Sequence, residues 1–188
     1  MSEDKKFLEV KNLKVEYTSE GKIVHAVNGV TFHLDRGRTV GLVGETGAGK
    51  TSIAKAILRI LPNPGGKISD GEVYLEGEDI LKRSERGMRK LRGRKISMIF
   101  QDPMTSLNPV KKVVDQIAEV IKTHNKKMSM AEATAEAIKM LGKVGIAENR
   151  AREYPHQFSG GMKQRVVIAM ALACNPDLLL ADEPTTAL

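Results

Sequence analysis

The chain has 188 residues, 41% hydrophobic and 28% charged, a composition typical of a globular protein with one sizeable domain, with or without a small subdomain. We expect neither a membrane-spanning nor a secreted protein, because there is no apolar run of spanning length and no apolar signal-peptide core. The net charge of +7 is scattered, and only 4% of residues are aromatic, so base-stacking platforms for nucleic acid are not expected.

The N-terminal part of the chain has the patterns of β-strands. Residues 7–17 largely alternate apolar and polar side chains, which predicts a half-exposed strand. Residues 23–34 continue the β character, with a break at Asn28-Gly29. Residues 40–43 are short and apolar throughout, as expected for a buried parallel strand.

A phosphate-binding loop follows directly. Residues 44–51 fit the pattern G-x-x-x-x-G-K-[ST] and lie between the apolar run and a helical stretch, residues 52–61. The glycines allow a tight turn whose N–H groups point at a phosphate, beside the positive end of a helix dipole. Lys50 would reach the β- and γ-phosphates, and the Thr51 hydroxyl would ligate Mg²⁺. The predicted nucleotide-binding residues here are Gly44, Glu45, Thr46, Gly47, Ala48, Gly49, Lys50, Thr51 and Ser52.

The middle of the chain adds both strands and helices. Strands are predicted at residues 72–76 and 96–100, and helices at 85–94, 113–122 and 130–144. The layout is an α/β core interrupted by an all-helical insert from about Pro109 to Gln157.

A second strand end carries two carboxylates. The apolar run 178–182 predicts a buried strand that finishes with Asp182 and Glu183. Asp182 would lie beside the phosphate loop and hold Mg²⁺, and Glu183 would polarise the attacking water. Alone, this pattern also fits a strand that ends in a polar turn. Combined with the phosphate loop upstream, it becomes a strong indication of nucleotide hydrolysis.

A third pattern lies at a predicted helix start. Ser159 can cap the helix, and Gly160 and Gly161 leave its first N–H groups exposed, which would form another anion site. The alternative is an ordinary capped helix. A second phosphate site is useful if two copies face each other and each Ser-Gly-Gly closes the other copy's phosphate loop.

Together these patterns resemble the ATP-binding subunit of an ABC transporter over essentially the whole chain. Residues 44–51 look like Walker A and 178–183 like Walker B, and 158–162 are similar to the LSGGQ signature, with Phe158 for Leu and Met162 for Gln. Gln101 matches the Q-loop glutamine, and Tyr17 matches the adenine-stacking aromatic of the A-loop. The amino-acid sequences of three segments resemble the dipeptide/oligopeptide (and nickel) importer branch of the family: residues 100–109, 154–162 and 181–188.

The resemblance implies an α/β P-loop NTPase of ABC type, with a mixed sheet core, an N-terminal antiparallel β part and an inserted helical subdomain. The implied division is residues 1–108 and 158–188 for the core and 109–157 for the helical subdomain. It also implies a head-to-tail dimer that binds ATP and Mg²⁺. This dimer would lie on the cytoplasmic face of the membrane, with two permease subunits and an external solute-binding protein.

The resemblance also assigns roles to individual residues. The implied catalytic residues are Glu183, Gln101 and Lys50. The implied Mg²⁺ ligands are Thr51, Gln101 and Asp182. Besides the phosphate loop, the implied nucleotide contacts are Tyr17, Ser159, Gly160 and Gly161.

The sequence departs from the family at its end. It stops at Leu188, before the family's D-loop aspartate and the strand that carries the switch histidine. We therefore expect a sequence truncated after Walker B, with an incomplete core sheet and an exposed apolar edge. Two other interpretations remain: a non-catalytic nucleotide-binding fragment, and a soluble ABC ATPase acting on DNA. The second is disfavoured because there is no heptad run and no cysteine pair.

Overall fold

The computed structural model describes residues 6–184, apart from the side chains of Pro103 and Met104. The chain divides into two compact units, Met1–Arg89 and Lys90–Leu188, and each is described by itself. No helix in the described range 6–184 has both the length and the apolar character needed to cross a membrane.

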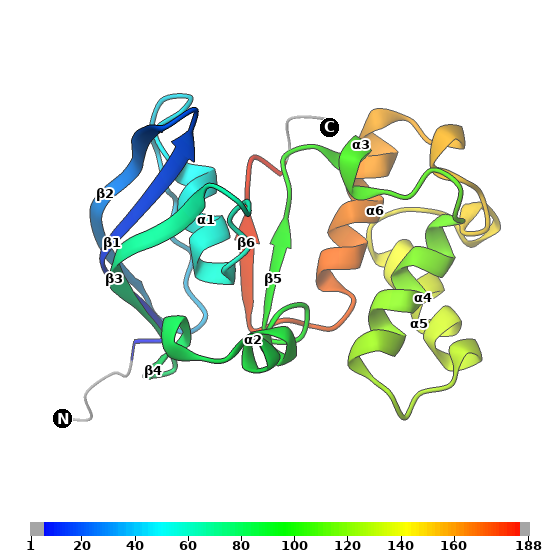
Figure 1. Ribbon diagram of the computed structural model, residues 1–188. Coiled ribbons are helices and arrows are strands. Elements are labelled where there is room, and N and C mark those ends of the chain that lie inside the picture. Colours follow the sequence, from blue (N-terminus) through cyan, green and yellow to red (C-terminus); the bar gives the residue numbers. More distant parts are fainter. Residues whose placement is uncertain (1–5, 185–188) are drawn as a thin grey trace. The chain divides into compact units, whose positions relative to one another are not determined.

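The first unit contains an antiparallel sheet with the strand order β2-β1-β3-β4 (Figure 1). Its strands are β1 (Leu8–Ser19), β2 (Lys22–Leu34), β3 (Gly66–Leu75) and β4 (Glu78–Asp79). The predicted strands at 7–17, 23–34 and 72–76 are confirmed, and β3 begins six residues earlier than expected. The interruption expected within β2 at Asn28-Gly29 is a shift of register rather than a break.

A change of phase in β1 explains why its apolar pattern is imperfect. Leu8 and Val10 are buried, and so are Leu13 and Val15, so the alternation resumes one residue late. The pairing of β1 with both neighbours shifts at this point, and Asn12 takes a φ of 45°. One extra residue in a strand is a β-bulge, and it keeps both apolar pairs on the buried face.

Helix α1 (Lys50–Leu58) follows the phosphate loop and contacts β1 and β2. It buries Ile53, Ala56 and Ile57. The helix was expected to continue to Leu61 but ends three residues earlier, because Arg59 adopts a left-handed φ of 53° and donates its N–H to the Ala56 carbonyl. Such a left-handed cap satisfies carbonyls that a helix end leaves open.

The prediction of a buried strand at residues 40–43 is wrong. The segment has no regular secondary structure, and Val40 and Leu42 are 44% and 40% exposed, while Val43 is fully exposed. A strand requires a neighbour to accept its backbone hydrogen bonds, and no strand within residues 6–184 pairs with this segment. The apolar run favoured burial, but a local pattern does not show whether a pairing strand is present.

The second unit combines two parallel strands with a helical layer (Figure 1). The two predicted strands are confirmed as β5 (Ile96–Ile99) and β6 (Leu178–Ala181), and the structure pairs them in parallel. The helices are α3 (Pro103–Ser106), α4 (Val113–His124), α5 (Met130–Lys143) and α6 (Gly160–Leu172), with short 3₁₀ turns at Glu148–Arg150 and Pro155–Gln157. Along the chain, a further 3₁₀ turn, Ile80–Lys82, and helix α2 (Glu85–Leu91) follow β4 and precede β5.

One apolar core holds the helices of the second unit together. Ile117 of α4, Leu141 of α5 and Val166 of α6 are completely buried in it. Leu179 of β6 is 39% exposed, and the edge of β6 away from β5 has no pairing strand in the described part of the chain. Helix α6 contacts β5, and the outer edge of β6 is open within the described residues.

Candidate functional site

The phosphate loop has the backbone geometry that its glycines suggested. Gly47 and Gly49 have φ values of 84° and 86°, in the left-handed region where side chains are strained. A Cβ on Gly49 would lie 2.2 Å from the Ala26 carbonyl oxygen, so the loop passes tightly against β2. The loop closes on itself through a 3.1 Å hydrogen bond from the Ala48 N–H to the Glu45 carbonyl.

Lys50 turns its ammonium group back into this loop. Its Nζ donates to the carbonyls of Gly44, at 2.7 Å, and Glu45, at 3.0 Å. Helix α1 starts here, and its N-cap, Gly49, contributes no side-chain hydrogen bond to the helix end. The first N–H groups of a helix lack intrahelical acceptors and carry a partial positive charge, so the loop, the helix end and Lys50 form a site suited to phosphate.

Tyr17 lies at the same end of α1. Its hydroxyl is 3.0 Å from the Ser52 hydroxyl, in the first turn of that helix, and Tyr17 is half-buried on β1. The phosphate loop, Ser52 and Tyr17 thus all belong to the first unit. The role of Tyr17 in stacking adenine stays a prediction.

Two predicted catalytic residues meet in the second unit. The amide of Gln101, just after β5, donates a 2.8 Å hydrogen bond from Nε2 to the Glu183 carboxylate, just after β6. They are neighbours because β5 and β6 are parallel and end at the same sheet edge. Glu183 has a φ of 46°, which is an unusual backbone conformation for a glutamate. Strained conformations of this kind cluster at functional sites.

Asp182 differs from Glu183 in its surroundings. It is 8% exposed, and its N–H donates to the Ile99 carbonyl at 3.0 Å, which continues the strand pairing. Glu183 is exposed, so this strand end carries one buried and one exposed carboxylate, which suits two different roles.

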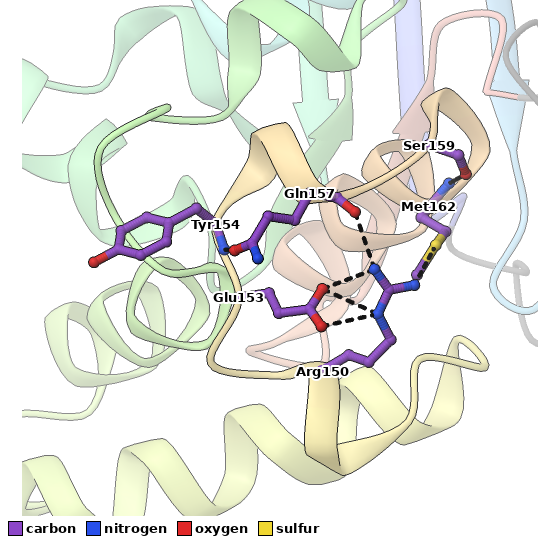
Figure 2. A network of polar contacts seen from close by, with 6 residues as sticks. All are labelled: Arg150, Glu153, Tyr154, Gln157, Ser159 and Met162. Carbon is purple, nitrogen blue, oxygen red and sulfur yellow. Dashed lines mark hydrogen bonds and ion pairs between the residues drawn. The ribbon is translucent and has the colours of Figure 1, made fainter.

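The predicted signature segment starts α6. The Ser159 hydroxyl accepts a 3.4 Å hydrogen bond from the Met162 N–H, so Ser159 is the helix cap that the sequence predicted. A Cβ on Gly160 would meet no atom within 4 Å, so the space in front of this helix end is open. Figure 2 shows the cap among its neighbours.

Sequence reasoning missed two residues that hold this region together. Gln164 of α6 is completely buried and donates from Nε2 to the Pro184 carbonyl at 2.7 Å, while its Oε1 has no hydrogen-bond partner within residues 6–184. A signal existed, because Gln164 occupies a buried face with Val167 and Ala171, three and seven residues on. Arg150, the second residue, gave no signal in the sequence.

The residues expected to hold Mg²⁺ have suitable chemistry. Mg²⁺ takes oxygen ligands and is usually held by one or two carboxylates together with phosphates and water. A hydroxyl at Thr51, a buried carboxylate at Asp182 and an amide at Gln101 fit that preference. No cluster of three or more histidine, cysteine, aspartate or glutamate side chains exists among the described residues, and this mode of binding does not require one.

A nucleotide-binding fold of this kind is also what the comparisons with known proteins show. The family model described as ABC transporter matches residues 27–186, so the chain belongs to the ABC transporter family. The fold is that of an ABC ATPase cassette, as predicted. A dimeric, post-hydrolysis structure of the cassette MJ0796 bound to ADP and Pi superposes with a TM-score of 0.86 at 30% identity, covering 96% of this chain and 75% of that one.

Similar curated proteins are transport ATP-binding subunits. The chain is 52% identical over 97% of its length to the oligopeptide transport ATP-binding protein OppD of Bacillus subtilis, and this covers 51% of that protein. It is 51% identical over 97% of its length to the dipeptide transport ATP-binding protein DppD of the same species, covering 55% of it. The chain thus spans about half the length of these relatives.

Proposed function

We propose that this chain is the ATP-binding and ATP-hydrolysing part of a subunit that energises an ABC importer of dipeptides or oligopeptides. The hydrogen bond between Gln101 and Glu183 carries the proposal for hydrolysis, since it joins an amide after β5 to a carboxylate after β6 at the same edge of the sheet. The similarity of the chain to peptide transport ATP-binding proteins supports peptide as the transported solute.

The proposed roles follow from the chemistry of each group. The loop 44–51 and Ser52 hold the phosphates, with Lys50 on the β- and γ-phosphates and Tyr17 against the adenine. Thr51, Asp182 and Gln101 hold Mg²⁺, which supplies positive charge where negative charge develops during phosphoryl transfer. Glu183 orients and polarises the attacking water, and Gln101 fixes the direction of that carboxylate.

We further propose that the active form is a dimer of ATP-binding subunits. Ser159, Gly160 and Gly161 at the start of α6 would close the nucleotide bound by the partner's phosphate loop. Two dimeric structures of the similar cassette MJ0796 support the dimer. The remaining proposed partners are two membrane permeases and an external solute-binding protein, with this subunit peripheral on the cytoplasmic face of the membrane.

The proposal is tested by replacing Glu183 with glutamine in the full-length protein. Glu183→Gln keeps the size and the hydrogen bond to Gln101 but removes the carboxylate, so we expect ATP turnover to fall at least about 100-fold. Affinity for ATP should be retained, whereas Lys50→Ala should reduce it. Turnover measured by phosphate release and affinity by fluorescence titration separate these effects. Retained turnover in Glu183→Gln would remove this residue from catalysis.

A further inference from the structure

Arg150 makes contacts along the whole segment that leads into α6. It lies in the 3₁₀ turn Glu148–Arg150, and its Nη2 donates to the Gln157 carbonyl at 3.0 Å. Its Nη1 lies 3.1 Å from the Met162 sulfur, and its guanidinium group lies 4.9 Å from the centre of the Phe158 ring. Figure 2 shows the guanidinium between the two ends of this segment.

Glu153 fixes the plane of the same guanidinium group. The Arg150 Nε lies 3.2 and 3.0 Å from the two carboxylate oxygens, and Nη2 lies 2.7 Å from one of them. The Glu153 carboxylate also raises the pKa of Arg150, which keeps the guanidinium charged. A bidentate pair of this kind sets orientation as well as distance, so the donors that face Gln157 and Met162 are held in place.

The segment between Arg150 and α6 has other contacts as well: the carbonyls of Ala151 and Glu153 accept from the N–H groups of Val114 and Val113, and Pro155–Gln157 forms a 3₁₀ turn. The Tyr154 N–H donates to the Gln157 side chain at 2.8 Å, and Phe158 is 5% exposed. Ser159 and Gly160, which follow directly, are exposed. The contacts of Arg150 before and after Ser159 therefore constrain where the cap and the first N–H groups of α6 point.

We propose that Arg150 is a positioning residue that holds Ser159 and Gly160 in the orientation needed to close a nucleotide bound by the partner subunit. This inference rests on the proposed function, because it assumes that the start of α6 contacts nucleotide. The planar guanidinium can engage a carboxylate, a carbonyl and a ring at once, which the single ammonium of lysine cannot do.

The first experiment measures the segment itself, independently of hydrolysis. Amide hydrogen exchange at residues 157–161 is compared between Arg150→Ala and Arg152→Ala in the full-length protein. Arg152 is the matched control, because it is exposed and lies two residues away. We expect exchange about tenfold faster in Arg150→Ala alone, since local opening follows lost contacts. Equal exchange in the two variants would overturn the inference.

The second experiment measures catalysis. If the wild-type importer hydrolyses ATP, Arg150→Ala should lower kcat about 10- to 100-fold, because a misplacement of about 1 Å can cost that much. ATP affinity of the phosphate loop and melting temperature should stay close to those of Arg152→Ala. Loss of ATP affinity and early melting would show a general structural role and contradict the inference. A wild-type kcat in Arg150→Lys would contradict the need for a planar guanidinium group.

Met162→Leu tests one Arg150 contact without changing Arg150. The variant keeps the volume of the side chain but loses the sulfur that accepts from the Arg150 Nη1, so we expect amide exchange at residues 157–161 to be faster than in wild type and slower than in Arg150→Ala. Exchange equal to that of wild type would contradict a role for the Met162 contact. Failure of the wild type to hydrolyse ATP counts against the proposed function, and hydrogen exchange still decides the role of Arg150.

Discussion

At the scale of single residues, the two carboxylates that follow β6 have different environments. Asp182 is buried and Glu183 is exposed with a left-handed backbone, although they are neighbours in the chain. The Glu183 carboxylate accepts a hydrogen bond from the Gln101 amide. This separation supports the proposal that one carboxylate serves the metal and the other serves the water.

Gly49 is the residue of the phosphate loop that tolerates change least. Gly49→Ala would place a Cβ 2.2 Å from the Ala26 carbonyl oxygen at a φ of 86°, so a clash adds to the backbone strain. We expect a loss of unfolding free energy greater than about 2 kcal/mol, of which strain alone accounts for roughly 1–2 kcal/mol. Urea denaturation of the wild type and the variant measures this loss of unfolding free energy.

Gly37→Ala is the control for that experiment. Gly37 has a φ of 74°, but its Cβ would meet no atom within 4 Å, so the variant carries strain without a clash. Equal losses in the two variants would contradict the close approach of the loop to β2.

At the scale of elements, sequence patterns predicted most helices and strands but not their partners. The run 96–100 predicted a strand and the run 178–182 a buried strand. The structure pairs the two in parallel, and β6 is only partly buried. The run 40–43 has the same texture and forms no strand, because pairing depends on distant residues that a local pattern does not contain. Arg59 similarly ends α1 through a backbone turn that its identity did not indicate.

Helix α5 shows an element whose start could be read from local chemistry. The Ser129 hydroxyl accepts from the Glu132 N–H at 3.2 Å, and the Glu132 carboxylate accepts from the Ser129 N–H at 2.7 Å, a capping box. Ser129→Ala should lower the unfolding free energy by about 1 kcal/mol. Thr134→Ala, at a half-buried position of the same helix, removes a hydroxyl that donates to the Met130 carbonyl within the helix, and it should be close to neutral. Urea denaturation of both variants compares them, and equal losses would contradict the role of the cap.

In the candidate site too, local features could be predicted from the sequence and contacts with distant residues could not. The loop 44–51 and the strand-end carboxylates could be predicted because their residue types and spacing are local. Arg150 and Gln164 were not assigned roles from the sequence. Besides its local ion pair with Glu153, Arg150 donates to the Gln157 carbonyl, and Gln164 donates to the Pro184 carbonyl. Any residue supplies a backbone carbonyl, so the sequence does not indicate these two contacts.

At the scale of the whole molecule, the predicted site residues are shared between two compact units. The phosphate loop and Tyr17 belong to Met1–Arg89, and the carboxylates and the signature segment belong to Lys90–Leu188. A nucleotide bound to the phosphate loop would stabilise the folded chain by mass action. Ligand-induced stability is therefore a readout of nucleotide binding by this loop.

The most direct test is a Mg²⁺–ATP titration followed by thermal melting, with Lys50→Ala as the control. At 100 times the dissociation constant, bound ATP should add about 2.7 kcal/mol of stability and raise the melting temperature by several degrees. The account predicts this rise in the wild type and its loss in Lys50→Ala, because Lys50 lies inside the phosphate loop. A melting temperature that ATP leaves unchanged, or raises equally in both proteins, would contradict nucleotide binding by this loop.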